Sequence, residues 1–191
     1  RAAKEIKLKD LNPHDAALFQ KAIEKEWKTN LDNGAIKVLD PIESQRIRQQ
    51  MPNRVMQSRL LHVAKPLDDP NQVDEEQILN CSPTGIPCKA KSRWIARGDK
   101  DPDLFSVCAS SPVIHRDTFM LGLQVIASQH WQLHFADYSQ AFMQGDGLQR
   151  EQPLFCEPRS KDLPGVQPGS LIQICKTVYG LVDAPYRWNQ H

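Results

Sequence analysis

The stretch WQLHFADYSQAFMQGD, residues 131–146, carries the pattern from which we derive the fold. Its first seven residues alternate between apolar and polar side chains, as in a strand with one buried face. Trp131, Leu133, Phe135 and Asp137 share that face. The alternation therefore predicts a buried strand that ends in a carboxylate. An ionised carboxylate in such a place is unfavourable unless it is paired or coordinates a cation.

The residues alone leave two interpretations of Asp137 open. An aspartate between a strand and a turn commonly caps the turn, which here spans residues 138–142. It can also bind Mg²⁺, since this ion is usually held by one or two protein carboxylates together with substrate phosphates.

A second feature is the basic segment KAKSRWIARG, residues 89–98. As a strand it places Lys89, Lys91, Arg93 and Arg97 on one face, with about 6.6 Å between successive odd positions. A row of like charges is relieved by an anionic partner such as a triphosphate or a nucleic-acid backbone. The alternative is a solvated edge strand, whose charges prevent pairing with another sheet.

The remaining patterns predict an α+β fold. Asn12 and Pro13 suit the start of a helix that Asn33 and Gly34 end. Residues 66–88 are rich in proline and acids, and we expect a long mobile connection there. The predicted elements are a helix within 11–34, a strand over 35–39, strands over 54–65 and 89–98 that pair as a hairpin, a buried helix over 116–130 with Asp117 as a candidate cap, strands over 153–158 and 170–176, and a helix from Pro185.

Positive charge is unevenly distributed along the chain. The net charge is only +1, but five Lys/Arg and no acid lie between residues 44 and 67, with Arg54 and Arg59 among them. Five more Lys/Arg and a single acid lie between residues 89 and 100. These two segments are the candidates for contact with an anionic polymer.

Several classes of protein and site do not fit the composition. The five cysteines are widely spaced and form no Cys-x-x-Cys pair, so we expect free thiols in a reducing compartment and no zinc site. No signal peptide is visible, and no apolar run approaches the roughly 18 residues that a membrane span needs. We therefore expect an intracellular protein, cytoplasmic or nuclear, that has no membrane partner.

Six segments, taken in order, resemble the N-terminal half of a copia-type retrotransposon reverse transcriptase domain. They are KEWKTNLDNGAIKVLD (25–40), QSRLLHVAKPLD (57–68), KSRWIARG (91–98), the stretch 111–146 that ends with the opening pattern, EQPLFCEP (151–158) and CKTVYGLVDAPYRW (175–188). The order of the six segments makes the resemblance specific.

The resemblance implies the fingers and part of the palm of a right-hand polymerase. Residues 13–115 would form the fingers, and residues 116–191 a partial palm. The intact enzyme would be an RNA-directed DNA polymerase, a nucleotidyltransferase within a Pol polyprotein. Its partners would be an RNA or DNA primer–template, deoxynucleoside triphosphates and the rest of the polyprotein, and its cofactor would be Mg²⁺.

The resemblance also implies roles for individual residues. Asp137 would be the first of three catalytic, metal-binding carboxylates, and Phe142 the aromatic side chain that excludes a ribose 2′-hydroxyl. The other nucleotide-binding residues would be Lys91, Arg93, Tyr179 and Gly180. The cations of the basic segments that would contact nucleic acid are Arg54, Arg59, Lys89 and Arg97.

The sequence departs from the family pattern where activity is concerned. The Tyr/Phe-x-Asp-Asp hairpin that supplies the other two carboxylates is not present in these 191 residues, so we expect a fragment that is inactive alone. Asp183 stands where Gln or Lys is common, and an acid there would repel a triphosphate unless it pointed away. The alternative is a non-catalytic nucleic-acid-binding or structural α+β module derived from such an element.

Overall fold

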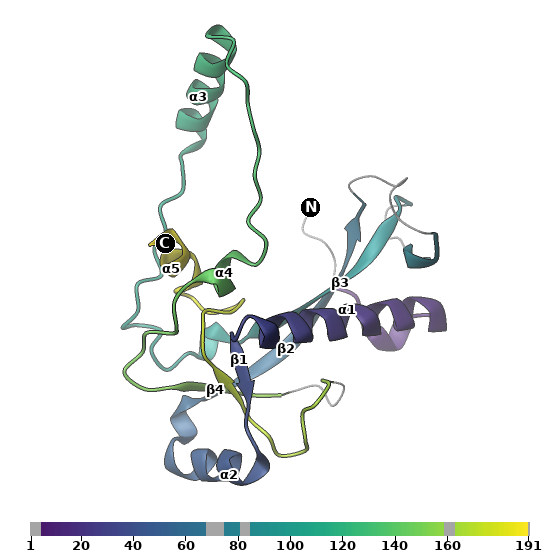
Figure 1. Ribbon diagram of the computed structural model, residues 1–191, viewed down its shortest axis with the longest axis vertical. Helices are drawn as coiled ribbons and strands as arrows, with labels where there is room; N and C mark the ends of the chain where they lie inside the picture. Colours follow the sequence, from purple (N-terminus) through teal and green to yellow (C-terminus); the bar gives the residue numbers. More distant parts are fainter. Residues whose placement is uncertain (1–4, 68–74, 81–84, 159–162, 191) are drawn as a thin grey trace.

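A mixed sheet with the strand order β1-β5-β4-β2-β3 organises the part of the chain that the structure describes (Figure 1). The computed structural model describes residues 5–67, 75–80, 85–158 and 163–190. The strands are β1 (Ile36–Val38), β2 (Val55–Pro66), β3 (Cys88–Ala96), β4 (Leu154–Glu157) and β5 (Ile172–Ile174). The helices are α1 (Pro13–Asp32), α2 (Pro41–Gln50), α3 (Arg116–Ser128), α4 (Ala141–Gln144) and α5 (Ala184–Asn189). The predicted α+β class is confirmed.

Helix α1 begins and ends at the predicted signals. The Asn12 side chain accepts a hydrogen bond from the Asp15 amide at 2.9 Å, and the helix ends before Asn33. Its buried side chains Phe19, Ile23 and Trp27 follow helical spacing and pack against the β2–β3 hairpin. This stripe leaves the opposite side of α1 to solvent, where lysines alternate with glutamates.

Strands β2 and β3 form the predicted antiparallel hairpin. Ser58 to Pro66 of β2 pair with β3, while Val55 to Gln57 pair in parallel with β4, so β2 joins the hairpin to the rest of the sheet. β3 is one of the two edge strands, and β1 is the other. Its even positions Ser92, Trp94 and Ala96 are buried, whereas the odd positions between them are half-exposed. The prediction that the cations share one face of the strand is confirmed for Lys89, Lys91 and Arg93, whereas Arg97 lies beyond the end of β3.

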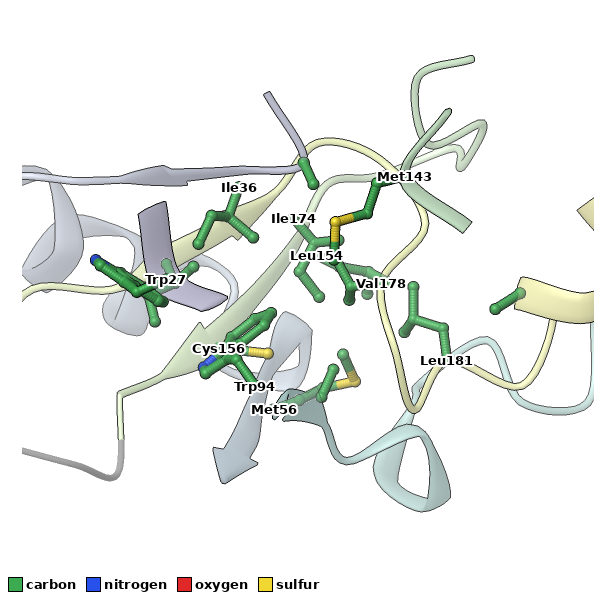
Figure 2. Packing of buried hydrophobic residues seen from close by; sticks show 14 of the residues in the cluster. Trp27, Ile36, Met56, Trp94, Met143, Leu154, Cys156, Ile174, Val178 and Leu181 are labelled. Atoms are coloured by element: carbon green, nitrogen blue, oxygen red, sulfur yellow. The ribbon is translucent and has the colours of Figure 1, made fainter. Parts of the chain in front are cut away.

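The main core lies between α1 and the sheet and continues to the segment after β5 (Figure 2). The rings of Trp27 and Trp94 meet edge to face, with 6.1 Å between their centroids. Val178 and Leu181 are buried in the same cluster. The two residues between them, Tyr179 and Gly180, are thereby held at the surface of the core.

Helix α2 was not predicted. Its start signal was nevertheless in the sequence, because Asp40 precedes Pro41 as a capping residue precedes a first-turn proline. The Asp40 carboxylate accepts hydrogen bonds from the amides of Ile42 and Glu43 at 2.8 and 2.9 Å.

Helix α3 forms, but the prediction that it is buried is wrong. None of its residues is buried, and Figure 1 shows it at the end of two extended arms, away from the sheet. The ring of His115 accepts a hydrogen bond from the Asp117 amide at 3.4 Å, so His115 and not Asp117 is the N-cap. Helical spacing predicts that a helix has an apolar face, but it does not supply a surface to cover that face.

The predicted strand at residues 131–137 is also wrong. The segment is irregular, and the side chains of Trp131, Leu133 and Phe135 are 62%, 45% and 86% exposed. A strand requires a hydrogen-bonding neighbour. No strand among the described residues pairs with this segment. Sequence alternation indicates how side chains would be divided between two faces, but not whether a partner strand is in reach.

The connection between β2 and β3 is more ordered than we expected over the part that the structure describes. Residues 75–77 form a 3₁₀ turn, and the Leu79 amide donates a hydrogen bond to the Cys88 carbonyl at 2.8 Å. Leu79 is buried against Phe19 and Ala64. Residues 68–74 and 81–84, which belong to the same predicted loop, lie outside the described residues.

The remaining strands and the last helix agree with the sequence prediction. β4 and β5 pair antiparallel, with Leu154 opposite Ile174. α5 begins one residue before Pro185. Cys88, Cys108, Cys156 and Cys175 are free thiols, as expected, and Cys81 lies outside the described residues. No helix in the described ranges is long and apolar enough to cross a membrane.

Stability is expected to fall with acidification because of His62. This histidine is buried in the hairpin, where its Nδ1 lies 2.9 Å from the Ser92 hydroxyl, and burial lowers its pKa. The pKa of His62 is 6.5 in the unfolded chain and lower in the folded one. Between these two pKa values the unfolded chain binds a proton that the folded chain does not, so the free energy of unfolding decreases as the pH falls through this window.

The measurement is the urea midpoint between pH 7 and 5, compared with that of His62→Asn. The asparagine amide can replace the hydrogen bond to Ser92 but does not titrate. Burial also raises the pKa of Glu26, which opposes the trend, so the relevant quantity is the difference between the two proteins. If the difference in urea midpoint between wild type and His62→Asn did not change with pH, His62 would not be the cause of the loss of stability.

Candidate functional site

Three side chains from distant parts of the sequence meet beside β3. The guanidinium carbon of Arg93 lies 4.6 Å from the centroid of the Tyr179 ring, which is cation–π distance. Phe142, from α4, contacts the same ring edge to face, with 5.3 Å between the centroids. All three residues are half-buried. We call Arg93, Phe142 and Tyr179 the aromatic–arginine cluster; the structure brings together three of the five predicted nucleotide-binding residues.

The charge of Arg93 remains available within this cluster. No carboxylate of the described residues forms an ion pair with Arg93. The tyrosine ring holds the guanidinium plane without using all of its five N–H donors. An arginine placed in this way can bind a phosphate through two parallel hydrogen bonds.

Gly180 explains why the Tyr-Gly pair can lie against β3. The Ala96 amide donates a hydrogen bond to the Tyr179 carbonyl at 2.9 Å, so the segment crosses the outer edge of the strand. Gly180 has a φ of +97°, and a Cβ atom there would overlap the Ala96 carbonyl oxygen. A Cβ atom on Gly98 would overlap the Gly180 carbonyl in the same way. The two glycines allow the backbones to approach, which places Tyr179 over Arg93.

A buried ion-pair network lies next to this crossing. It joins three arginines to three aspartates: Arg54, Arg150 and Arg187, with Asp101, Asp103 and Asp183. At its centre one Arg150 nitrogen lies 3.0 Å from Asp101 and 2.9 Å from Asp183. The side chains of these three residues are at most 3% exposed. The network is balanced in charge and ties the turn after β3 to the start of α5.

The structure resolves the question raised by Asp183. Its carboxylate is buried and accepts hydrogen bonds from Arg150 at 2.9 Å and from Arg187 at 2.6 Å. An aspartate neutralised by two arginines does not present its charge to an anionic ligand. Sequence reasoning recognised Asp183 as unusual but could not identify its partners, which lie in two different segments.

Lys91 and Lys89 lie in a cleft between β3 and α1, which we call the basic cleft. The cleft has a volume of about 1160 Å³. Lys91 has a lowered pKa, first because of burial and then because of the nearby charges of Arg93 and Lys65. Glu26 of α1 opposes this effect, and its own pKa is raised by burial. Its carboxylate accepts a hydrogen bond from the Trp94 amide at 3.4 Å, on the outer edge of β3.

Three of the four predicted nucleic-acid contacts are engaged in ion pairs with carboxylates. Arg54 is buried: its guanidinium pairs with Asp103 at 2.6 and 2.9 Å and donates to two backbone carbonyls. The hydrogen bond from Arg54 holds the pKa of Asp103 below its ordinary value. Arg59 pairs with Glu5 at 3.3 Å, and Arg97 pairs with Asp99. Of the four residues, only Lys89 lies in the basic cleft.

Asp137 is exposed in the irregular segment and does not join the aromatic–arginine cluster. Its neighbour Tyr138 packs against Trp188 of α5, with ring centroids 5.4 Å apart, and Ser139 lines the basic cleft. Within the described ranges, no three His, Cys, Asp or Glu side chains gather as metal ligands. The described residues therefore contain no cluster of metal ligands around Asp137, and we derive no step through this ion.

Comparison with protein families supports one assignment. The model of the family described as reverse transcriptase (RNA-dependent DNA polymerase) matches residues 83–191, which is more than half of the chain. The match begins before β3 and includes all three residues of the aromatic–arginine cluster. Helix α1 and strand β2 lie outside it. The searches of curated proteins and of solved structures found no match.

Proposed function

The chain belongs to the reverse transcriptase (RNA-dependent DNA polymerase) family, and we propose that its aromatic–arginine cluster binds the incoming nucleotide of a copia-type enzyme. The observation that carries the proposal is the contact of Arg93 with Tyr179, to which Phe142 is added from a third segment. Arg93 binds the triphosphate, Tyr179 orients Arg93, and Phe142 lies under the sugar.

The proposed reaction is template-directed nucleotidyl transfer by the intact Pol polyprotein, on an RNA or DNA primer–template. Residues 13–115 act as fingers and residues 116–191 as part of the palm. Asp137 is the proposed first carboxylate for Mg²⁺, which in such enzymes neutralises charge on the phosphates. The residues described here bind and orient the nucleotide, because a guanidinium beside an aromatic ring fixes a phosphate at one position.

A second function is favoured by a specific observation. Carboxylates do not gather around Asp137 in the described ranges, whereas cations gather in the basic cleft. This combination suits a module that binds nucleic acid without catalysis. Under this alternative the chain would bind nucleic acid but would not distinguish nucleoside triphosphates from other polyanions.

Arg93→Ala is expected to weaken nucleotide binding roughly 10- to 100-fold, since charge-assisted hydrogen bonds to the phosphates are lost. Binding of a fluorescent deoxynucleoside triphosphate analogue, measured by anisotropy, tests this. The matched control is Arg46→Ala, which removes an exposed arginine of α2.

The two variants change net charge equally, so a general electrostatic effect would weaken nucleotide binding by both of them. The proposal predicts that only Arg93→Ala loses affinity for the nucleotide. Unchanged tryptophan fluorescence would show that this variant is still folded. It also predicts that tripolyphosphate competes less well than the triphosphate, because the base and sugar contact the aromatic residues. Equal binding by wild type and Arg93→Ala would rule out the proposed site.

A further inference from the structure

We infer that α3 and the segment 131–137 form an interface with the same surface of a second copy of this chain. Among the described residues, all but three of the exposed large apolar side chains lie between residues 105 and 138. Figure 1 shows α3 at the end of two extended arms, away from the sheet. The inference does not depend on the proposed function, because the residues of the aromatic–arginine cluster lie outside this surface.

The apolar surface is large enough for a stable dimer. Seven side chains, each between 43% and 86% exposed, make up what we call the arm surface: Phe119, Met120, Leu121, Val125, Trp131, Leu133 and Phe135. Since large side chains measure roughly 150–250 Å² each, these seven expose on the order of 800 Å². A standard interface buries about 800 Å² on each partner. One contact between two arm surfaces therefore reaches the usual size.

The absence of charge in the arm surface favours a second copy over a charged partner. Residues 118–136 contain no Lys, Arg, Asp or Glu. In a dimer with two-fold symmetry a surface patch faces itself, so any net charge on it would face a like charge. A neutral apolar patch avoids this repulsion and is complementary to itself.

The edges of the five-stranded sheet do not offer the segment 131–137 a place to pair. On the outer edge of β3, the Trp94 amide donates to the side chain of Glu26, and the Ala96 amide donates to the Tyr179 carbonyl. β1, the other edge strand, has only three residues. A strand of seven residues therefore needs a partner outside this sheet.

The same segment of a second copy supplies such a partner. Two neighbouring strands related by a two-fold axis normal to their ribbon run antiparallel, and the axis leaves each face of the ribbon on its own side. Trp131, Leu133 and Phe135 of both copies would then share one face. A two-stranded ribbon is stable only when its apolar face is covered, for example by a helix. The two α3 helices provide that cover.

Gly122 fits a close contact between two α3 helices. It lies in the middle of α3, where glycine is unfavourable, and a Cβ atom there would meet no atom of its own copy within 4 Å. Leu121 and Val125, which are one helical turn apart, lie beside it on the exposed side. The packing within one copy therefore does not require a glycine here, whereas the approach of a second helix does.

The test is sedimentation velocity of the whole chain at about 1 to 100 µM, the range in which an interface of moderate affinity dissociates. The mass is expected to rise from 21.7 kDa to twice that value and to stop there. Leu121→Gln combined with Val125→Gln should raise the dissociation constant at least about 30-fold, because two apolar side chains lose their burial. A chain that stays monomeric at the highest concentration, or whose mass rises beyond that of a dimer, would overturn the inference.

The matched control is Leu31→Gln combined with Ile42→Gln. Both are exposed aliphatic side chains on helices, α1 and α2, and neither belongs to the arm surface. The control should leave the dissociation constant within about 2-fold of wild type. Urea midpoints close to that of wild type establish that each double variant is folded. Equal weakening of the dimer by both double variants would overturn the inference.

Gly122→Leu separates a specific interface from non-specific association. The variant adds apolar surface at an exposed position, so non-specific association would become tighter. If two α3 helices meet there, the added side chain forces them apart, and we expect the dissociation constant to rise at least about 10-fold. Tighter association by Gly122→Leu would overturn the inference.

The salt dependence of dimerisation gives a further readout. The arm surface carries no charge, so the dissociation constant should change less than about 2-fold between about 50 and 500 mM salt. A dimer that dissociates steeply with salt would be held by charged groups, such as the lysines of the basic cleft, and would overturn the inference.

Discussion

Replacement of Arg150 by methionine is expected to lower the free energy of unfolding by about 3–5 kcal/mol. The change keeps most of the volume but leaves the carboxylates of Asp101 and Asp183 buried without their shared cation. An uncompensated buried charge is far more unfavourable than a lost surface ion pair. The measurement is urea unfolding followed by the fluorescence of Trp27 and Trp94, which are both about 1% exposed.

The control for Arg150 is Arg48→Met. Arg48 also forms a bidentate pair, with Glu157 at 2.7 and 2.8 Å, but both side chains are substantially exposed. Its loss should lower stability by no more than about 1 kcal/mol. Similar values for the two variants would contradict the view that burial makes the network important. If Arg150→Met does not fold, Asp183→Asn, which keeps the shape and the Arg150–Asp101 pair, provides a milder comparison.

Gly180→Ala is expected to lower the free energy of unfolding by about 2–5 kcal/mol, from backbone strain and overlap together. A side chain at φ +97° is strained, and its Cβ atom would overlap the Ala96 carbonyl oxygen and crowd Ile95. The backbone would have to move away from β3. The hydrogen bond from the Ala96 amide to Tyr179 and the contact of Tyr179 with Arg93 would be lost with it.

Gly165→Ala separates the two contributions. Gly165 has a φ of +75°, and no atom lies within 4 Å of the position of its Cβ. This variant measures strain alone, expected at about 1–2 kcal/mol. If Gly180→Ala lowers the free energy of unfolding by more than Gly165→Ala does, the difference measures the effect of the overlap. Equal losses at the two positions would mean that the close approach of the Tyr-Gly segment to β3 is not needed for the fold.

Both predictions concern the support of the aromatic–arginine cluster. The ion-pair network fixes the turn after β3 to the start of α5. Gly98 and Gly180 allow the Tyr-Gly segment to approach the end of β3. A variant that loosens either support should weaken nucleotide binding even though it changes no residue of the cluster. Function and stability are linked at this point because Tyr179 is positioned by backbone contacts and not by its own side chain alone.

The predictable part of the fold is the part in which local chemistry and burial agree. Capping residues and apolar spacing identified α1, and alternation with turn residues identified the β2–β3 hairpin and the β4–β5 pair. Helix α2 could have been found from Asp40 and Pro41. The resemblance implied a nucleotide-binding role for Arg93, Phe142 and Tyr179, and in the structure both Arg93 and Phe142 contact the Tyr179 ring.

The opening stretch marks the limit of sequence prediction. Its alternation through Phe135 and Asp137 is a strong strand signal, yet the segment is exposed and unpaired with any described strand. Pairing depends on hydrogen-bond partners that approach from elsewhere in the chain. The periodicity of a segment contains no information about them. The role of Asp137 as a metal ligand therefore remains a prediction of the resemblance.

The sequence by itself determined which segments become helices and strands at the core, and which residue types face one side of β3. These properties are local, since a period and a cap are set by neighbouring residues. Only the tertiary structure decided that Asp183 is neutralised by Arg150 and Arg187 and that the lysines of α1 and β3 share a cleft. Arg187 is only four residues from Asp183, but Arg150 and the two sets of lysines come from segments far apart in the chain. The energies of such long-range pairings depend on burial and distance, which packing alone establishes.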